Sequence, residues 1–177
     1  LSKEINLQKK FKDVVIISTV LPGTLKRYIY PVMSKYINLT YNPFFIAMGT
    51  TIENFLFSEM ILLGIQKNKS YSKLVKFYKT INNSPIFKTN VENAELIKVV
   101  YNTFISTKIS FINSVMETCH SLPNTDVDEI SKALSLCTDR IISTKYMFGG
   151  MGDGGGCHPR DNIALSWLAN KNNLSFN

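Results

Sequence analysis

The sequence contains few residues that could hold a metal ion or a disulfide bond. Its 177 residues include three cysteines and two histidines. No two of the cysteines form a CxxC pair, and their odd number argues against a disulfide framework. Two histidines, His120 and His158, do not complete the ligand pattern of a structural zinc site. We therefore expect no metal, and we expect a reducing compartment, the cytoplasm.

Long apolar runs are also missing. No run reaches the roughly 20 residues that cross a bilayer, and no signal-peptide pattern is present. We therefore expect no membrane partner. Charged residues make up 19% of the chain and hydrophobic residues 45%, as in a globular protein. The net charge of +7 suits an anionic ligand, but it does not separate a small anion from a nucleic acid.

Acidic residues are absent between positions 60 and 91. The spacing of apolar residues predicts an amphipathic helix over 70–81, with Lys73, Lys76 and Lys79 on its polar side. These lysines fit either a phosphate or nucleic-acid patch or a solvated helix face. We favour the solvated face, because no recognisable nucleic-acid motif accompanies it. No nucleic-acid partner is expected.

Short apolar runs predict the strands. The run over 14–20 ends at Pro22 and Gly23, which is typical of a strand buried on both faces in a parallel sheet. Thr24 would then cap a helix over 25–36. Residues 60–65 form a second buried-strand candidate, and residues 38–45 and 85–87 read as extended.

The longest predicted element is a helix over 92–121. It contains no glycine or proline and would be about 45 Å long. Glu92 and Glu95 suit its N-terminus. Its apolar residues extend around most of the circumference, which favours burial in a subunit interface. Lys98 and Asn102 project together, and they would either stabilise an oxyanion or face water.

Glycine is concentrated in one loop. Six of the nine glycines lie between Gly149 and Gly156, directly before Cys157 and Pro159. Proline favours the first turn of a helix, where a thiolate is stabilised, so the loop could approach an anion beside a reactive sulfur. The alternative is a flexible linker. A GxGxxG match within it is rejected as a nucleotide turn, because no second strand follows.

Two further helices complete the pattern. A short helix should end near Cys137, with Asp126 or Thr125 as its cap, and an amphipathic helix should follow Pro159.

Five motifs occur in an order that resembles one known family. They are Ser18-Thr19-Val20-x-Pro22-Gly23-Thr24, Tyr41-Asn42-Pro43-x-Phe45, Ala94-Glu95-x-x-Lys98-x-x-x-Asn102 with Lys108-Ile109-Ser110-Phe111-x-Asn113, Asp139-Arg140-Ile141, and Gly152-x-Gly154-Gly155-x-Cys157-x-Pro159-Arg160-Asp161. Over nearly its whole length the chain resembles the nucleotide-sugar 6-dehydrogenases, the UDP-glucose/GDP-mannose dehydrogenase family.

The resemblance implies a mostly α fold with an α/β N-terminal part. Residues 1–88 would be the end of a Rossmann-like parallel sheet that binds NAD. Residues 89–177 would be an all-α dimerisation domain, similar to the C-terminal domain of 6-phosphogluconate dehydrogenase. The helix over 92–121 would join the two and form a homodimer. The family's NAD fingerprint and C-terminal nucleotide-sugar domain would be missing, so the chain would be a core fragment.

The family's reaction oxidises the sugar C6 alcohol of a nucleotide sugar to a carboxylate with two NAD. Cys157 matches the nucleophile, Lys98 and Asn102 match the oxyanion-stabilising pair, and Asp161 matches the acid that handles protons and water. The remaining matches are Thr19 near the reacting centre, Arg140, Tyr146, Gly154 and Gly155 in the substrate loop, and Arg160 near the cofactor.

Two positions depart from the family pattern. Phe44 and Met48 stand where the family usually has glutamates that assist proton transfer. The alternative function is therefore a non-catalytic dimerisation or anion-binding module that keeps the fold.

Overall fold

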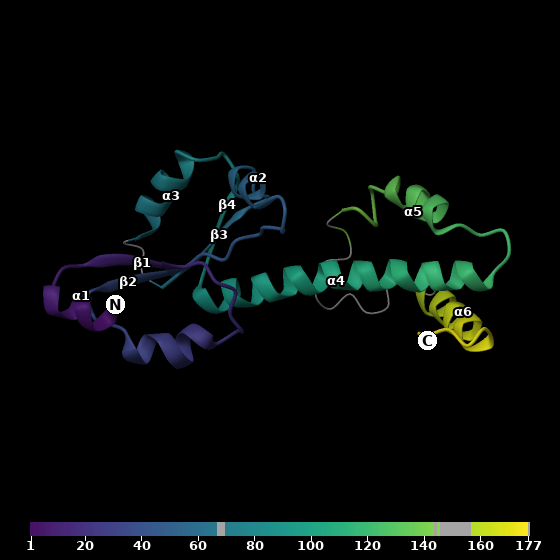
Figure 1. The fold of residues 1–177 in the computed structure, drawn as a ribbon, viewed down its shortest axis with the longest axis horizontal. Helices are drawn as coiled ribbons and strands as arrows, with labels where there is room; N and C mark the ends of the chain where they lie inside the picture. The colour runs from purple at the N-terminus through teal and green to yellow at the C-terminus, as the bar shows by residue number, and fades with distance from the viewer. Residues whose placement is uncertain (67–69, 144, 146–156, 177) are drawn as a thin grey trace. The chain divides into compact units, whose positions relative to one another are not determined.

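The computed structural model describes residues 1–66, 70–143, 145 and 157–176. These residues form two compact units, Leu1–Phe104 and Ile105–Asn177. The elements are α1 (Ser2–Gln8), β1 (Lys12–Ile16), η1 (Leu25–Ile29), η2 (Tyr30–Val32), β2 (Ile37–Tyr41), α2 (Thr51–Leu56), β3 (Ile61–Ile65), α3 (Tyr71–Lys79), β4 (Ile86–Thr89), α4 (Val91–Ser121), α5 (Val127–Ser135) and α6 (Cys157–Lys171) (Figure 1). The domain boundary at residues 88 and 89 stays a prediction, since α4 contributes to both units.

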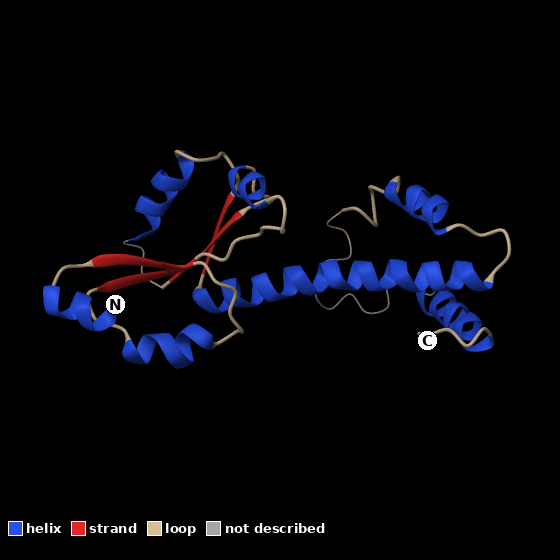
Figure 2. Ribbon diagram, in the orientation of Figure 1, coloured by secondary structure: helices blue, strands red, loops and turns tan. Residues whose placement is uncertain are grey.

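The first unit contains a four-stranded sheet with the order β1-β2-β3-β4 (Figure 2). β1 pairs in parallel with β2, and β3 pairs in parallel with β4. β2 and β3 are antiparallel, and only two positions pair, Thr40 with Ile65 and Tyr41 with Gly64. The predicted Rossmann-like sheet is thus confirmed as mainly parallel, with one antiparallel pairing that the sequence did not indicate.

Helices cover both faces of this sheet (Figure 1). Because side chains alternate along a strand, β3 contributes to two cores. Leu62 packs with residues of α1, η1 and α4 on one face, whereas Leu63 packs with residues of α2 and α3 on the other. The first face is the one against which the N-terminal part of α4 is held, and α4 carries the predicted Lys98.

Gly64 allows α4 to approach the sheet closely. A Cβ atom placed on Gly64 would lie 2.7 Å from the Ala94 Cβ and 3.1 Å from the Val91 Cα. Neither neighbour can move as the end of a flexible side chain could. A glycine in β3 and an alanine in α4 therefore together set the distance between strand and helix.

Near the N-terminus, one prediction is confirmed only in part and another is wrong. The strand predicted over 14–20 is β1, which is shorter, begins at Lys12 and is only half-buried at its last three residues. The helix predicted over 25–36 is replaced by the short π-helix η1 and the 3₁₀ turn η2, which contains Pro31. Proline lacks an N–H donor and clashes with the preceding turn, so a regular α-helix cannot continue through this position.

The strand over 60–65 and the helices over 70–81 and 92–121 are confirmed. β3 is buried at all five positions, and α4 runs without interruption from Val91 to Ser121. α3 covers Tyr71–Lys79. These elements have the clearest patterns, a continuous apolar run, a one-sided apolar stripe and a long stretch free of helix breakers.

The second unit contains the later part of α4 with α5 and α6. Asp126 caps α5, because its side chain accepts hydrogen bonds from the backbone N–H groups of Asp128 and Glu129. Glu117 of α4 accepts hydrogen bonds from Ser175, at 2.6 Å from the backbone N and 2.5 Å from Oγ. This contact fastens the segment after α6 to α4. Within the described residues, no helix is both long and apolar enough to span a membrane.

Candidate active-site residues

Lys98 is a buried lysine in the first unit. It lies on the stripe of α4 that faces the sheet, one turn after Ala94 and Glu95, and only 6% of its surface is exposed. Burial lowers the pKa of the Lys98 ammonium below its ordinary value. Among the described residues it makes no ion pair. A buried ammonium without a carboxylate partner is suited to meeting an anion.

An amide and two aromatic rings surround the ammonium. Lys98 Nζ lies 3.4 Å from Asn102 Oδ1, as the spacing of four residues predicts. It also lies 4.7 Å from the centroid of the Phe45 ring and 5.8 Å from that of Tyr101. Ring faces attract a cation, so they offset part of the cost of burial. The pairing of Lys98 with Asn102 is therefore a structural fact, whereas its catalytic role stays a prediction.

Glu95 fixes the loop that carries Thr19. The carboxylate is fully buried and accepts hydrogen bonds from Gly23 N at 2.7 Å and from Leu25 N at 2.9 Å. Thr24, the predicted cap, makes no capping hydrogen bond. The sequence suggested only that Glu95 suits the start of its own helix. It instead satisfies the N–H groups at the start of η1, which no sequence signal assigns.

Thr19 is exposed just beyond the carboxyl end of β1. This end lies beside the carboxyl end of β2, because Ile16 pairs with Tyr41. The carboxyl ends of parallel strands are the edge at which open α/β sheets bind ligands. The loop that carries Thr19 follows β1 of this sheet, and the N-terminal part of α4, which carries Lys98, packs on the same sheet. Glu95 of α4 accepts a hydrogen bond from Gly23 and so connects this loop directly to α4.

Tyr101 is a neighbour of Lys98 that the sequence analysis did not assign to the site. Its ring packs against Phe45 at a centroid distance of 4.6 Å, and its hydroxyl donates a 2.7 Å hydrogen bond to Glu59. This bond, together with burial and the charge of Glu59, raises the pKa of Tyr101 to about 12. The only feature of the sequence that could have assigned Tyr101 to the site is its position, three residues after Lys98 on the same helix.

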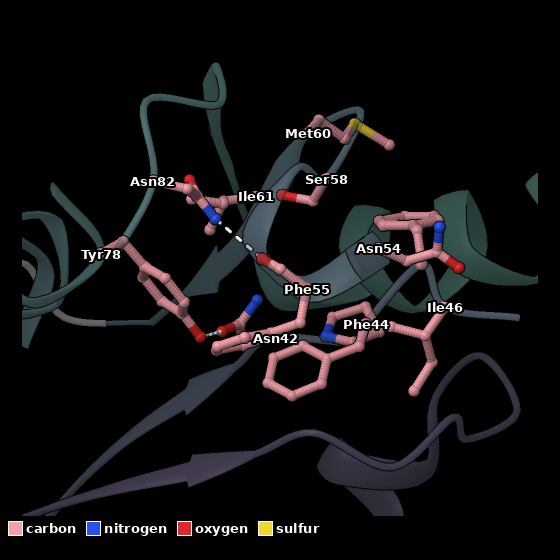
Figure 3. Close-up of a pocket in the computed structure, with 12 residues that line it drawn as sticks. Asn42, Phe44, Ile46, Asn54, Phe55, Ser58, Met60, Ile61, Tyr78 and Asn82 are labelled. Atoms are coloured by element: carbon pink, nitrogen blue, oxygen red, sulfur yellow. Dashed lines mark hydrogen bonds between the residues drawn. The ribbon is translucent and has the colours of Figure 1, made fainter. Parts of the chain in front are cut away.

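A hydrogen-bonded network supports the segment before Phe45 (Figure 3). Asn42 accepts a hydrogen bond from the Tyr78 hydroxyl, which Figure 3 shows as a dashed line. Its amide nitrogen also donates a hydrogen bond to Leu62 O at 2.9 Å. The adjoining pocket, lined by Phe44, Phe55 and others, has a volume of about 20 Å³. That is room for about one water molecule, so the pocket is not a substrate site.

The second unit carries the predicted nucleophile. Cys157 is the first residue of α6 and is exposed, as the helix-start prediction required. Asp161 lies one turn further along the same helix. Its carboxylate accepts a 2.9 Å hydrogen bond from Nε of the adjacent Arg160 in an exposed ion pair. A positive and a negative group thus follow the thiol within one helical turn.

The remaining predicted residues are Arg140, Tyr146, Gly154 and Gly155. Arg140 is exposed in the turn after α5, beside Asp139, which binds Lys145. Tyr146, Gly154 and Gly155 lie outside the described residues. No cluster of metal ligands occurs in the parts of the chain that are described. Among the predicted residues that the structure describes, Thr19, Lys98 and Asn102 thus belong to the first unit, whereas Arg140, Cys157, Arg160 and Asp161 belong to the second.

Comparison with protein families gives matches on both sides of the start of α4. The central domain of the UDP-glucose/GDP-mannose dehydrogenase family matches residues 92–177. The NAD binding domain of the same family matches residues 2–82.

Individual relatives agree with these matches. The UDP-glucose 6-dehydrogenase of Rickettsia conorii is 32% identical over 163 residues, which are 91% of this chain and 37% of that protein. A UDP-glucose 6-dehydrogenase of Bacillus subtilis is 32% identical over 178 residues, 94% of this chain and 36% of the relative. The chain thus spans little more than a third of the length of these curated relatives.

Solved structures show the same fold. A GDP-mannose dehydrogenase from Pseudomonas aeruginosa superposes with a TM-score of 0.90 at 26% identity, over 97% of this chain and 41% of the other. A UDP-glucose dehydrogenase from Pyrobaculum islandicum gives a TM-score of 0.70 at 27% identity, over 98% of this chain and 40% of the other.

Proposed function

Because the chain belongs to the UDP-glucose/GDP-mannose dehydrogenase family, we propose that it is the core of an NAD-dependent nucleotide-sugar 6-dehydrogenase. The substrate would be UDP-glucose or a related UDP- or GDP-sugar. The observation that carries this proposal is the buried ammonium of Lys98 beside Asn102, in a chain that also places Cys157 at the start of a helix. Activity is proposed for the longer protein, since the chain covers 37% of a curated relative.

Cys157 is the proposed nucleophile. The sugar C6 alcohol is first oxidised to the aldehyde, and the thiolate then adds to the aldehyde carbon, which forms a C–S bond and an oxyanion. Loss of hydride from this carbon gives a thioester. Attack by water breaks the C–S bond and releases the carboxylate and the thiolate. The two oxidations together consume one water and two hydride acceptors.

Lys98, Asn102 and Asp161 are the proposed partners of the nucleophile. The buried Lys98 ammonium and the exposed Asn102 amide group would stabilise the negative oxygen at each stage, because the hydrogen bond between them preorganises a charge and a dipole. Asp161, one turn after Cys157, would accept the proton that the attacking water releases. The exposed Arg140 would bind the substrate, as would Tyr146, Gly154 and Gly155.

The described residues fit one border of an NAD site. Thr19 lies exposed where the paired carboxyl ends of β1 and β2 form the ligand-binding edge of the sheet. Arg160 would offer its exposed guanidinium to the cofactor, and Thr19 would lie near the reacting centre. When bound, NAD supplies the hydride acceptor for both oxidations. The glycine-rich turn that would hold its phosphates is not found after any described strand.

A homodimer is the proposed assembly. In the second unit, α4 exposes several large apolar side chains, namely Ile105, Ile109, Phe111 and Met116. Burying such a surface against a second copy would remove it from water. Sedimentation of the chain should give twice the monomer mass, and a monomer at micromolar concentration would contradict this assembly. The three cysteines are free, which fits the proposed cytoplasmic location.

The second candidate is a non-catalytic dimerisation or anion-binding module. Phe44 packs against Phe55 at a ring-centroid distance of 5.2 Å, and Met48 is fully exposed, so neither position supplies a carboxylate. Thiol kinetics separate the two candidates. A catalytic Cys157 should react with Ellman's reagent faster than the exposed Cys137, whereas equal rates favour the module.

The decisive experiment supplies the full-length protein with UDP-glucose, GDP-mannose and N-acetylated UDP-sugars and follows NADH. Cys157→Ala should abolish carboxylate formation, and Cys137→Ser, at another exposed thiol, should leave it unchanged. Normal turnover of the Cys157→Ala variant would contradict the proposed mechanism. Absence of NADH with every sugar would favour the non-catalytic module.

A further inference from the structure

We infer that Tyr101, anchored by Glu59, is a positioning residue that holds the Lys98 ammonium in place. The inference rests on the proposed function for its catalytic meaning, although the arrangement itself is a property of the first unit. It assigns a role to Tyr101 and Glu59, which are neither the proposed nucleophile nor members of the oxyanion-stabilising pair, and which are not proposed to bind the cofactor.

The buried ammonium of Lys98 has few strong interactions that hold it in place. Its ammonium is buried, and no described carboxylate pairs with it. The nearest carboxylate along the helix, that of Glu95, is engaged by the N–H groups of Gly23 and Leu25. The ammonium is therefore held by ring faces and one long hydrogen bond, which are weaker and less directional than an ion pair.

The ring of Tyr101 packs beside the Lys98 ammonium. The residue follows Lys98 by three positions, so both side chains project from one side of α4. Tyr101 meets Phe45 edge to face, and the ammonium lies within 6 Å of both ring centroids. The Tyr101 ring thus shields one side of Lys98 from water and limits where Nζ can lie.

A hydrogen bond to Glu59 holds the Tyr101 ring in place. Glu59 belongs to the segment between α2 and β3, and its exposed carboxylate accepts the hydrogen bond from the Tyr101 hydroxyl at 2.7 Å. A hydrogen bond to an ionised acceptor is stronger than a neutral one. Glu59 therefore contacts the far end of the ring rather than the ammonium, and Lys98 stays available to an anion.

The proposed role of Tyr101 is not acid–base chemistry. The hydrogen bond to Glu59, together with burial and the charge of Glu59, raises the pKa of its hydroxyl to about 12, far above neutral pH. A group so far from the working pH is a poor proton donor or acceptor in catalysis. Its role is therefore geometric.

The test measures Lys98 itself in the full-length protein. The rate at which acetic anhydride modifies its amine is followed against pH by mass spectrometry of the Lys98 peptide. In Tyr101→Ala the midpoint should move upward, toward that of an ordinary lysine. The shift follows because the variant relieves burial, the cause of the lowered pKa. Tyr101→Phe keeps the ring and should shift the midpoint less. An unchanged midpoint in a folded Tyr101→Ala variant would overturn the inference.

A double-mutant cycle keeps the test valid if Tyr101→Ala does not fold. Glu59→Ala and Tyr101→Phe remove the two ends of the same hydrogen bond. Each should shift the Lys98 midpoint in the same direction, and the double variant should shift it no more than one of them. Fully additive shifts, or none, would overturn the anchoring role.

Enzyme kinetics provide a test that is separate from the titration of Lys98. If the wild-type protein oxidises a nucleotide sugar, Tyr101→Ala should lower kcat about tenfold or more with a smaller change in KM, because the oxyanion partner is displaced. An unchanged kcat would contradict the positioning role in catalysis. If no sugar is oxidised, the proposed function fails, while the titration of Lys98 still decides whether Tyr101 and Glu59 position the ammonium.

Discussion

The carboxylate of Glu95 and the backbone N–H of Gly23 form a 2.7 Å hydrogen bond, although 72 positions separate the two residues in the sequence. A second bond, from Leu25 N, completes the clamp. Glu95 stands on the same helix as Lys98, and Gly23 ends the loop that carries Thr19. One buried carboxylate therefore sets the position of that loop relative to the helix of the candidate oxyanion site.

Replacing Glu95 should destabilise the chain. Glu95→Ala would leave two backbone donors without their acceptor, at a cost of about 2–4 kcal/mol in the free energy of unfolding. Urea denaturation followed by circular dichroism measures this loss. Glu92→Gln, in the exposed first turn of the same helix, is the matched control and should change stability by less than about 0.5 kcal/mol. Equal losses in both variants would contradict the clamp.

Gly64 and Ala94 should behave as a coupled pair. Gly64→Ala places a Cβ atom 2.7 Å from that of Ala94 and should cost about 1–3 kcal/mol of stability. Ala94→Gly alone should cost about 1 kcal/mol, since glycine weakens a helix. The double variant should lose less than the sum of the two, because the closest clash disappears. Additive losses in thermal or urea unfolding would show that the close approach is not the cause.

Asp13 should contribute an acid-sensitive part of the stability. It accepts hydrogen bonds from Lys73 Nζ and Ser70 Oγ, each at 2.7 Å, and the bond from Lys73 is the main cause that lowers its pKa below 3.8. A lowered carboxyl pKa adds stability that is fully present above pH 3.8 and is lost as the pH falls through the lower, folded-state value. Because the pair is largely exposed, the contribution is under about 1 kcal/mol.

The measurement is the free energy of unfolding between pH 2 and pH 6. Lys73→Met should flatten its decline below pH 4, whereas Lys76→Met, on the exposed side of the same helix, should not. Identical curves for the two variants would show that the Lys73 bond is not what lowers the Asp13 pKa.

The contact between Glu117 and Ser175 should open in acid. Both hydrogen bonds from Ser175 lower the pKa of Glu117 below 4.5. The contact should therefore persist above pH 4.5 and be lost as the pH falls further, through the lower folded-state pKa. The amide chemical shift of Ser175 in NMR spectra would report the change. Glu117→Gln should remove the titration, and an unaltered titration in that variant would assign the effect to another group.

The sequence predicted those elements whose pattern is local. β3, α3 and α4 follow from an apolar run, a one-sided stripe and a stretch without glycine or proline, and the helix start at Cys157 follows from Pro159. The helix predicted over 25–36 was wrong because Pro31 interrupts it. The pairing of Lys98 with Asn102 was predictable, since four residues separate them on one helix.

The remaining contacts of the candidate site depend on tertiary packing. Glu95 reaches the start of η1, and Tyr101 reaches Glu59, across sequence separations that no periodicity encodes. The antiparallel pairing of β2 with β3 is of the same kind. Such contacts depend on where the N-terminal part of α4 docks on the sheet, and the sequence alone does not fix this docking.

The short pairing between β2 and β3 has a consequence for the cooperativity of unfolding. Two paired positions and the bond from Asn42 to Leu62 O join the two halves of the sheet, whereas five and four positions pair within them. Regions with fewer hydrogen bonds open at lower free energy, and contiguous segments open together. In native-state hydrogen exchange, the first unit should therefore behave as two foldons that separate along this junction before either parallel pair of strands comes apart.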